Sequence, residues 1–353
     1  MSLFNDASQR KTGFRLALAA TCLATAVVML GAFTRLVDAG LGCPDWPGCY
    51  GHLTWPTEAH EITRAQELFP DAPVEASKTW PEMVHRYFAS TLGLVIGILA
   101  ILAWRKREQD GYPFRLPIFL LFVVVWQGLF GMWTVTLKLW PQVVTLHLLG
   151  GMATLSLLWL LTLRLDDTRW VVSTKSWRRL QNTKLWLVGA VIIVFTQIAL
   201  GGWTSANYAA FACPDFPSCH AQWWPPMNAS QGFNFAQSIG PNYLGGQLES
   251  EARVAIHMGH RIGAIITTLY LLVFCGALLR VNERRVRRMA LVIVAALGLQ
   301  ITLGISNILW MVPLSMAVLH NIGAALLLLT LVTLGAKIWA AQAPRQENLA
   351  NGN

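Results

Sequence analysis

Four histidines in the apolar part of the chain are the residues best able to do chemistry. They are His85, His147, His260 and His320, and each stands a few residues inside a long apolar block. An ionisable side chain in such a block is costly to bury and is a candidate functional residue by default. A lone histidine there most often joins two helices by a hydrogen bond, whereas two imidazoles at equal depth can ligate one iron from opposite sides. The four histidines therefore predict two sites for a b-type haem.

The residues beside the histidines differ between the two predicted sites. Arg86 and Arg261 each follow a histidine, and a planar guanidinium there could hold a haem propionate. Glu82 lies three residues before His85, on the same helical face, and could relay protons or stabilise positive charge. His257 stands at the position equivalent to Glu82. This difference predicts that one site does chemistry while the other holds a permanent cofactor, unless Glu82 is a structural, salt-bridged residue.

Two cysteine pairs are the second chemical feature. Cys43 and Cys49 enclose the residues Pro-Asp-Trp-Pro-Gly, and Cys213 and Cys219 enclose Pro-Asp-Phe-Pro-Ser. Two prolines restrict each segment to a turn, which could bring the sulfur atoms within bonding range. We therefore expect the disulfides Cys43–Cys49 and Cys213–Cys219, either structural or redox-active. A metal site with a nearby histidine is the alternative, although two cysteines at this spacing are uncommon ligands for zinc.

The same landmarks occur in both halves of the chain, in the same order and shifted by 170 to 175 residues. The matched pairs are Cys43 and Cys213, His85 and His260, Gln127 and Gln300, and His147 and His320. Such a series predicts a tandem duplication. Because four membrane spans separate the copies, both copies have the same orientation. We expect an N-terminal half at 1–165, a cytoplasmic linker at 166–184 and a C-terminal half at 185–353.

Eight apolar blocks supply the helices that must position these residues. Hydrophobic residues make up 54% of the chain and charged residues 13%, against about 25% charged in soluble domains. Each block is long enough to cross a hydrocarbon core of about 30 Å. We therefore expect an all-α integral membrane protein with two pseudo-symmetric four-helix bundles, the first block being an uncleaved span. The blocks are 14–35, 83–104, 116–137, 142–164, 185–204, 254–279, 289–310 and 314–340.

The charge distribution predicts which side of the membrane each loop faces. Most of the 27 Lys and Arg residues lie near the termini and in the connectors after the second, fourth and sixth blocks. This positive-inside pattern puts both termini in the cytoplasm and the cysteine segments outside, where oxidising conditions favour disulfides. All four histidines then lie about 5–12 Å below the outer edge. We expect a multi-pass protein of the inner membrane that contacts lipid and not nucleic acid.

Taken together, these elements resemble the haem A synthase family, membrane enzymes that convert haem O to haem A for cytochrome c oxidase. The likeness extends from Phe14 to about Trp339, and no single element of it would be specific alone. Its elements are Glu82-Met-Val-His85-Arg86, His147, His260-Arg261, His320 and the pair Cys43/Cys49.

The resemblance implies a role for each half. Haem O, the substrate, would bind the N-terminal half near His85 and His147, and haem b would be ligated in the C-terminal half by His260 and His320. His257, one turn from His260, could replace it as ligand or donate a hydrogen bond. The reaction would oxidise the C8 methyl group of haem O to a formyl group by successive hydroxylations. Glu82 is implied as the catalytic carboxylate, and Cys43–Cys49 as a functional outer disulfide.

The implied partners are an electron donor and a haem O synthase, and the oligomeric state, a homo-oligomer included, is left open. One alternative is a di-haem b-type cytochrome that passes electrons between a quinol and outer-face thiols. It explains the histidines and cysteines but gives Glu82 no task. A haem transporter or chaperone is a third reading, and it would not need paired histidines in both halves. A substrate that leaves chemically altered would decide for the enzyme.

Overall fold

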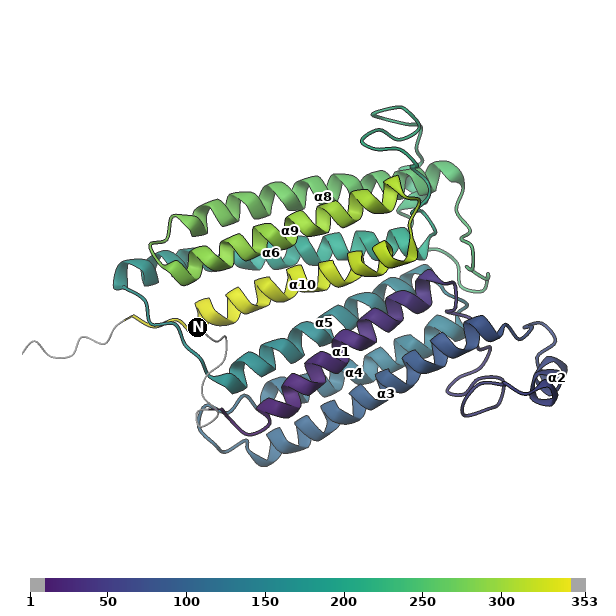
Figure 1. Ribbon diagram of the computed structural model, residues 1–353, viewed down its shortest axis with the longest axis horizontal. Coiled ribbons are helices and arrows are strands. Elements are labelled where there is room, and N and C mark those ends of the chain that lie inside the picture. Colours follow the sequence, from purple (N-terminus) through teal and green to yellow (C-terminus); the bar gives the residue numbers. More distant parts are fainter. Residues whose placement is uncertain (1–9, 344–353) are drawn as a thin grey trace, which may run out of the picture.

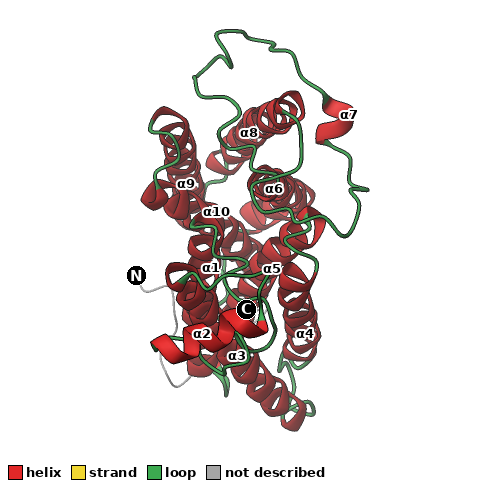
Figure 2. Ribbon diagram, turned by 90° about the vertical axis from the view of Figure 1, so that its right-hand side faces the viewer, coloured by secondary structure: helices red, strands yellow, loops and turns green. Residues whose placement is uncertain are grey.

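The computed structural model describes residues 10–343, and within them the chain forms ten helices and no β-strand. Eight of these helices are long and apolar enough to cross a membrane, which confirms the expected all-helical membrane fold. The eight are α1 (Phe14–Leu36), α3 (Ala76–Arg105), α4 (Arg115–Thr136), α5 (Pro141–Asp166), α6 (Thr174–Ala206), α8 (Ser250–Leu279), α9 (Arg284–Leu309) and α10 (Leu314–Trp339). The short helices α2 (Ala59–Leu68) and α7 (Ala229–Gly232) lie in loops at one end of the molecule (Figure 2).

The eight long helices form two rings of four (Figure 1). In one ring α1 packs on α3, α3 on α4, α4 on α5 and α5 on α1. In the other α6 packs on α8, α8 on α9, α9 on α10 and α10 on α6. This arrangement is consistent with the tandem bundles expected from the repeat. It puts α3 diagonally opposite α5, and α8 diagonally opposite α10.

The two rings meet along α1, α5, α6 and α10. Leucine side chains of α5 and α10 fill this contact, and Leu158 and Leu331 are fully buried there. In hydrocarbon such packing and interhelical hydrogen bonds hold helices together. One such bond runs from Trp159 Nε1 on α5 to Thr333 Oγ1 on α10, at 2.7 Å.

A polar cluster also joins the two halves, at the end of the molecule that carries the cysteine loops. Arg35 at the end of α1 pairs with Asp38 at 3.2 Å and donates to the Tyr208 hydroxyl at 2.9 Å. Tyr208 in turn donates to Asp38 at 2.8 Å. These contacts connect the segments that follow α1 and α6, the equivalent helices of the two halves.

Two helices begin well before the apolar blocks expected from the sequence. α3 starts at Ala76 rather than 83, and α6 starts at Thr174 rather than 185. Hydropathy marks only the part of a helix that lies in lipid, while hydrogen bonding continues into the aqueous zone. At α6 the Ser173 hydroxyl caps the helix by accepting from the Ser176 N–H at 3.3 Å. The irregular connection between the two halves is therefore residues 167–173.

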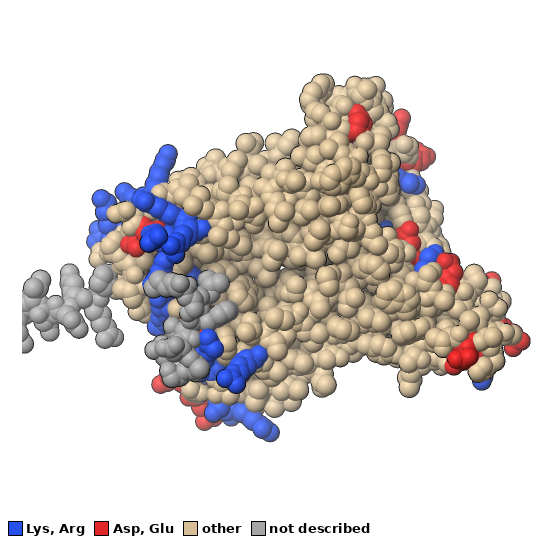
Figure 3. All heavy atoms as spheres, viewed as in Figure 1, with Lys and Arg blue, Asp and Glu red and all other residues tan. Residues whose placement is uncertain are grey.

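Charged side chains gather at the two ends of the molecule and leave an uncharged band between them (Figure 3). Basic residues dominate one end, where the connectors after α3, α5 and α8 lie, and acidic residues are more frequent at the other. An uncharged band between two polar ends is the surface that a bilayer requires.

Candidate functional site

The structure brings the four predicted histidines together as two pairs. His85 on α3 faces His147 on α5, with ring centroids 6.4 Å apart and planes at 88°. His260 on α8 faces His320 on α10, with centroids 6.5 Å apart and planes at 79°. In each case the two histidines come from helices diagonally opposite in their ring, so each pair spans the centre of its bundle.

The spacing within each pair fits two axial ligands of one metalloporphyrin. Metal–imidazole bonds are about 2 Å long. Two such bonds, together with the distance from the ligating nitrogen to the centroid in each ring, separate the centroids by about 6 Å. Among the described residues no group of three or more His, Cys, Asp or Glu lies together. A haem supplies four ring nitrogens of its own and would need only the two histidines of one pair as protein ligands.

Each histidine ring lies over a glycine of a neighbouring helix. A Cβ atom built on Gly31 would lie 2.9 Å from His85 Cε1, and one built on Gly131 would lie 3.4 Å from His147 Cε1. In the second half, a Cβ on Gly201 or Gly304 would lie 3.2 or 3.1 Å from Cε1 of its histidine. The glycines thus let α1, α4, α6 and α9 approach the imidazoles closely.

The side-chain hydrogen-bond partners of the histidine rings differ between the halves. Gln197 Nε2 lies 3.0 Å from His260 Nδ1, and Gln300 Nε2 lies 3.2 Å from His320 Nδ1. Nδ1 of both His85 and His147 is buried and has no side-chain partner among the described residues, where the two rings form hydrogen bonds only with the backbone of Val27 and of Gln127. Comparison of the two halves of the sequence could not identify Gln197, because the equivalent position in the first half is Val27.

Glu82 is buried, with 5% of its surface exposed, and both of its carboxylate oxygens have donors. Oε1 pairs with the Arg86 guanidinium one turn later on α3, and Oε2 accepts from the Cys43 backbone N–H at 3.0 Å. Its counterpart His257 is also buried, and Nδ1 of that ring lies 2.9 Å from the Ala209 carbonyl oxygen. Thus His257 points to the loop after α6 and does not face His320.

The two predicted arginines hold the cysteine loops onto the bundles. Arg86 donates to the carbonyl oxygens of Asp45 at 3.0 Å and Pro47 at 3.1 Å, and also to Gly48. The guanidinium of Arg261 donates in the same way to the carbonyl oxygens of its own loop, at 2.7 Å for the residue before Cys219 and 3.1 Å for Cys213. Sequence reasoning missed these contacts, because they join segments about 40 residues apart. A contact of either arginine with a haem propionate stays a prediction.

Both expected disulfides are present, Cys43–Cys49 and Cys213–Cys219. Each closes a loop in which an aspartate accepts backbone hydrogen bonds. In the second loop the Ser218 hydroxyl and the Ala221 and His220 N–H groups hold the pKa of Asp215 at about 2. With all four loop cysteines in disulfides, a cysteine-ligated metal site has no thiolates.

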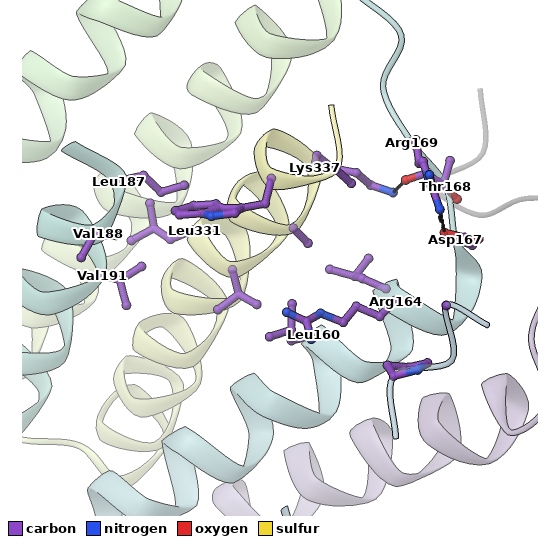
Figure 4. A pocket seen from close by; sticks show the side chains of 18 of the residues that line it. Leu160, Arg164, Asp167, Thr168, Arg169, Leu187, Val188, Val191, Leu331 and Lys337 are labelled. Atoms are coloured by element: carbon purple, nitrogen blue, oxygen red, sulfur yellow. Dashed lines mark hydrogen bonds and ion pairs between the residues drawn. The ribbon is translucent and has the colours of Figure 1, made fainter. Parts of the chain in front are cut away.

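A cavity of about 730 Å³ lies far from the histidines, at the basic end between α5, α6 and α10 (Figure 4). Its lining includes the apolar residues Leu160 and Leu331 and the basic residues Arg164 and Lys337. The Lys337 ammonium group donates to the Thr168 carbonyl oxygen at 3.1 Å. None of the predicted site residues lines this cavity.

The fold and the site define an eight-helix membrane protein with two facing pairs of histidines. A family model described as cytochrome oxidase assembly protein matches residues 14–332. The chain is 46% identical to a haem A synthase of Shewanella oneidensis over 89% of this chain and 92% of that protein. A haem A synthase of Caulobacter vibrioides is 29% identical over 86% of this chain and 89% of its own length. The chain therefore belongs to the haem A synthase family.

Proposed function

We propose that this protein is a membrane oxidoreductase that converts haem O to haem A. It oxidises the C8 methyl group of haem O to a formyl group by successive hydroxylations, a step in making haem A for cytochrome c oxidase. The similarity to haem A synthases over nearly the whole chain supports this activity. The observation of the structure that carries it is the buried, fixed carboxylate of Glu82 one helical turn before His85, where the second half has His257.

The two halves divide the work between substrate and cofactor. Haem O binds the N-terminal half, residues 1–165, between His85 and His147, and haem b binds the C-terminal half, residues 185–353, between His260 and His320. The centroid separations of 6.4 and 6.5 Å support ligation at both pairs. His257 is engaged with the Ala209 carbonyl group, which favours His260 as the ligand. Haem b in the C-terminal half would supply one-electron chemistry.

Glu82 acts on the substrate side as the catalytic carboxylate. The pairing with Arg86 and the Cys43 N–H fixes its position, so it does not have to be ordered when the substrate binds. A fixed carboxylate can accept a proton or stabilise positive charge that develops on the substrate. The Cys43–Cys49 disulfide closes the loop that supplies the N–H group, which supports a functional role for this bridge. Arg86 and Arg261 each follow a proposed haem ligand in sequence, which supports a contact of their guanidinium groups with a haem propionate.

The protein spans the inner membrane with both termini in the cytoplasm and the cysteine loops outside. The basic end seen in Figure 3 supports this orientation, because short cytoplasmic loops carry the excess of Lys and Arg. Lipid surrounds the uncharged band. Hydroxylation of a methyl group consumes electrons, so the protein works with an electron donor, and a haem O synthase supplies its substrate.

The activity can be tested with detergent-solubilised protein that receives haem O, oxygen and a chemical reductant. We expect haem A or its hydroxylated intermediate in the extracted haems, resolved by chromatography and mass. Protein heated before the assay controls for chemical oxidation of haem O. Unchanged haem O, together with reduction of bound haem by a quinol, would instead support the electron-transferring cytochrome.

A further inference from the structure

A glutamine and a glycine accompany three of the four histidines. This glycine follows the histidine by three residues on the same helix. The glutamine lies on the neighbouring helix, four residues before a second glycine, the one that the histidine ring lies over. A Cβ atom on any of the three following glycines would overlap the amide end of the glutamine side chain, so the glutamine takes this position only if the residue is glycine or if the amide moves. The three sets are Gln127 with Gly150 at His147, Gln197 with Gly263 at His260, and Gln300 with Gly323 at His320.

In the C-terminal half these glutamines reach the imidazoles, and Gln300 Nε2 also lies 3.3 Å from His320 Nε2. Gln197 Nε2 lies 3.0 Å from His260 Nδ1, and Gln300 Nε2 lies 3.2 Å from His320 Nδ1. Oε1 of both glutamines is buried and has no hydrogen-bond partner among the described residues. When iron takes Nε2 of a histidine, Nδ1 carries the proton and needs an acceptor. Rotation of either amide by 180° presents that acceptor, since the two amide ends are interchangeable in shape. At Gln197 the rotation exchanges the present bond from Nε2 to the His260 carbonyl oxygen, 2.9 Å long, for the bond to Nδ1.

His85 is the exception, because both the glutamine and the following glycine are replaced there. Val27 stands where Gln197 stands in the second half, and Phe88 stands where Gly263 stands. Val27 offers no side-chain acceptor and reaches the His85 ring through its backbone alone. Nδ1 of His147 also lacks a side-chain partner in the described part of the chain, but Gln127 stands next to it. A hydrogen bond at the outer nitrogen of a metal-bound histidine fixes the ring and raises its basicity as a ligand. His85 lacks this side-chain support.

We propose that His85 is the exchangeable axial ligand of the substrate haem, while Gln197 and Gln300 are positioning residues that keep the resident haem ligated on both sides. The assignment of substrate to the N-terminal half rests on the proposed function. Release of His85 would free one coordination position of a haem held here, and His85 lies on α3, the helix that also carries Glu82. Small ligands such as oxygen would then enter beside that carboxylate, and the C-terminal haem would stay closed to them.

Carbon monoxide tests this directly, because it binds ferrous haem only where an axial position opens. In purified, dithionite-reduced wild-type protein loaded with both haems, we expect carbon monoxide to bind one haem of the two. The double variant Val27→Gln/Phe88→Gly gives His85 the pair that the other histidines have. Its carbon monoxide affinity should fall about tenfold or more at unchanged haem content.

The variant Gln197→Val is the reciprocal change and makes the C-terminal site resemble that of His85. We expect its resident haem to become reactive towards carbon monoxide, so that two haems bind it. The measurement on Gln197→Val tests the proposal even if the double variant does not fold. Equal carbon monoxide binding in the wild type and in a fully haem-loaded variant of either kind would overturn the proposal. Because the measurement needs no conversion of haem O, it is independent of whether the protein proves to be a haem A synthase.

Discussion

Replacing Glu82 by Gln is expected to stop the conversion of haem O while both haem sites remain loaded. Glutamine keeps the size of the side chain and an oxygen that can accept from the Cys43 N–H, but it removes the negative charge and the basic oxygen. A positioned acid or base typically contributes 10²–10⁴-fold to a rate. We therefore expect turnover to fall by about that factor and haem O to accumulate in the protein.

Stability is not expected to explain the loss. Removing one partner of a buried ion pair can cost about 3–5 kcal/mol, but Arg86 retains the carbonyl oxygens of the first cysteine loop as acceptors. The matched control is Glu75→Gln, because Glu75 is an exposed carboxylate just before α3 that pairs with Lys78 at 2.8 Å. Its turnover should equal that of the wild type. Wild-type turnover in the Glu82→Gln protein would remove Glu82 from the mechanism.

His320→Ala is expected to lose the resident haem b. Loss of an outer-shell partner of a metal ligand already costs 10–100-fold in affinity, so loss of the ligand itself should cost about 100-fold or more. His260→Ala should behave in the same way, since the two rings face each other across one bundle. Haem B content per protein, measured after extraction, reports the effect.

The N-terminal pair provides the comparison. His147→Ala should retain haem b and lose the substrate haem instead. His257→Ala should keep its haem b, because His257 faces the Ala209 carbonyl group and not His320. Equal loss of haem B from the His147 and His320 variants would contradict the division of labour between the halves.

Much of the fold could be predicted from the sequence because lipid imposes simple requirements. A span needs about 20 apolar residues, and eight such blocks became eight long helices. The helix ends could not be predicted in the same way. The first turns of α3 and α6 lie outside the apolar blocks, and their bounds depend on local capping, as at Ser173.

The pairing of the histidines followed from their depth and from the repeat, both of which the sequence contains. Features that differ between the repeats were harder to find. Gln197 has no counterpart in the first half, so self-comparison passes over it. Arg86 and Arg261 bind the cysteine loops through hydrogen bonds to backbone carbonyl oxygens. Every residue type has such an oxygen, so the sequence does not show which residues will accept these bonds.

The central claim is that one half holds a permanent haem and the other holds a substrate that changes. The most direct measurement is the identity of the haems extracted from protein purified from cells that also make haem O. We predict haem B together with haem O, its hydroxylated intermediate or haem A in the wild type, and haem B alone when both His85 and His147 are replaced by Ala. Haem B alone in the wild type, despite a supply of haem O, would contradict the account and favour a cytochrome that only transfers electrons.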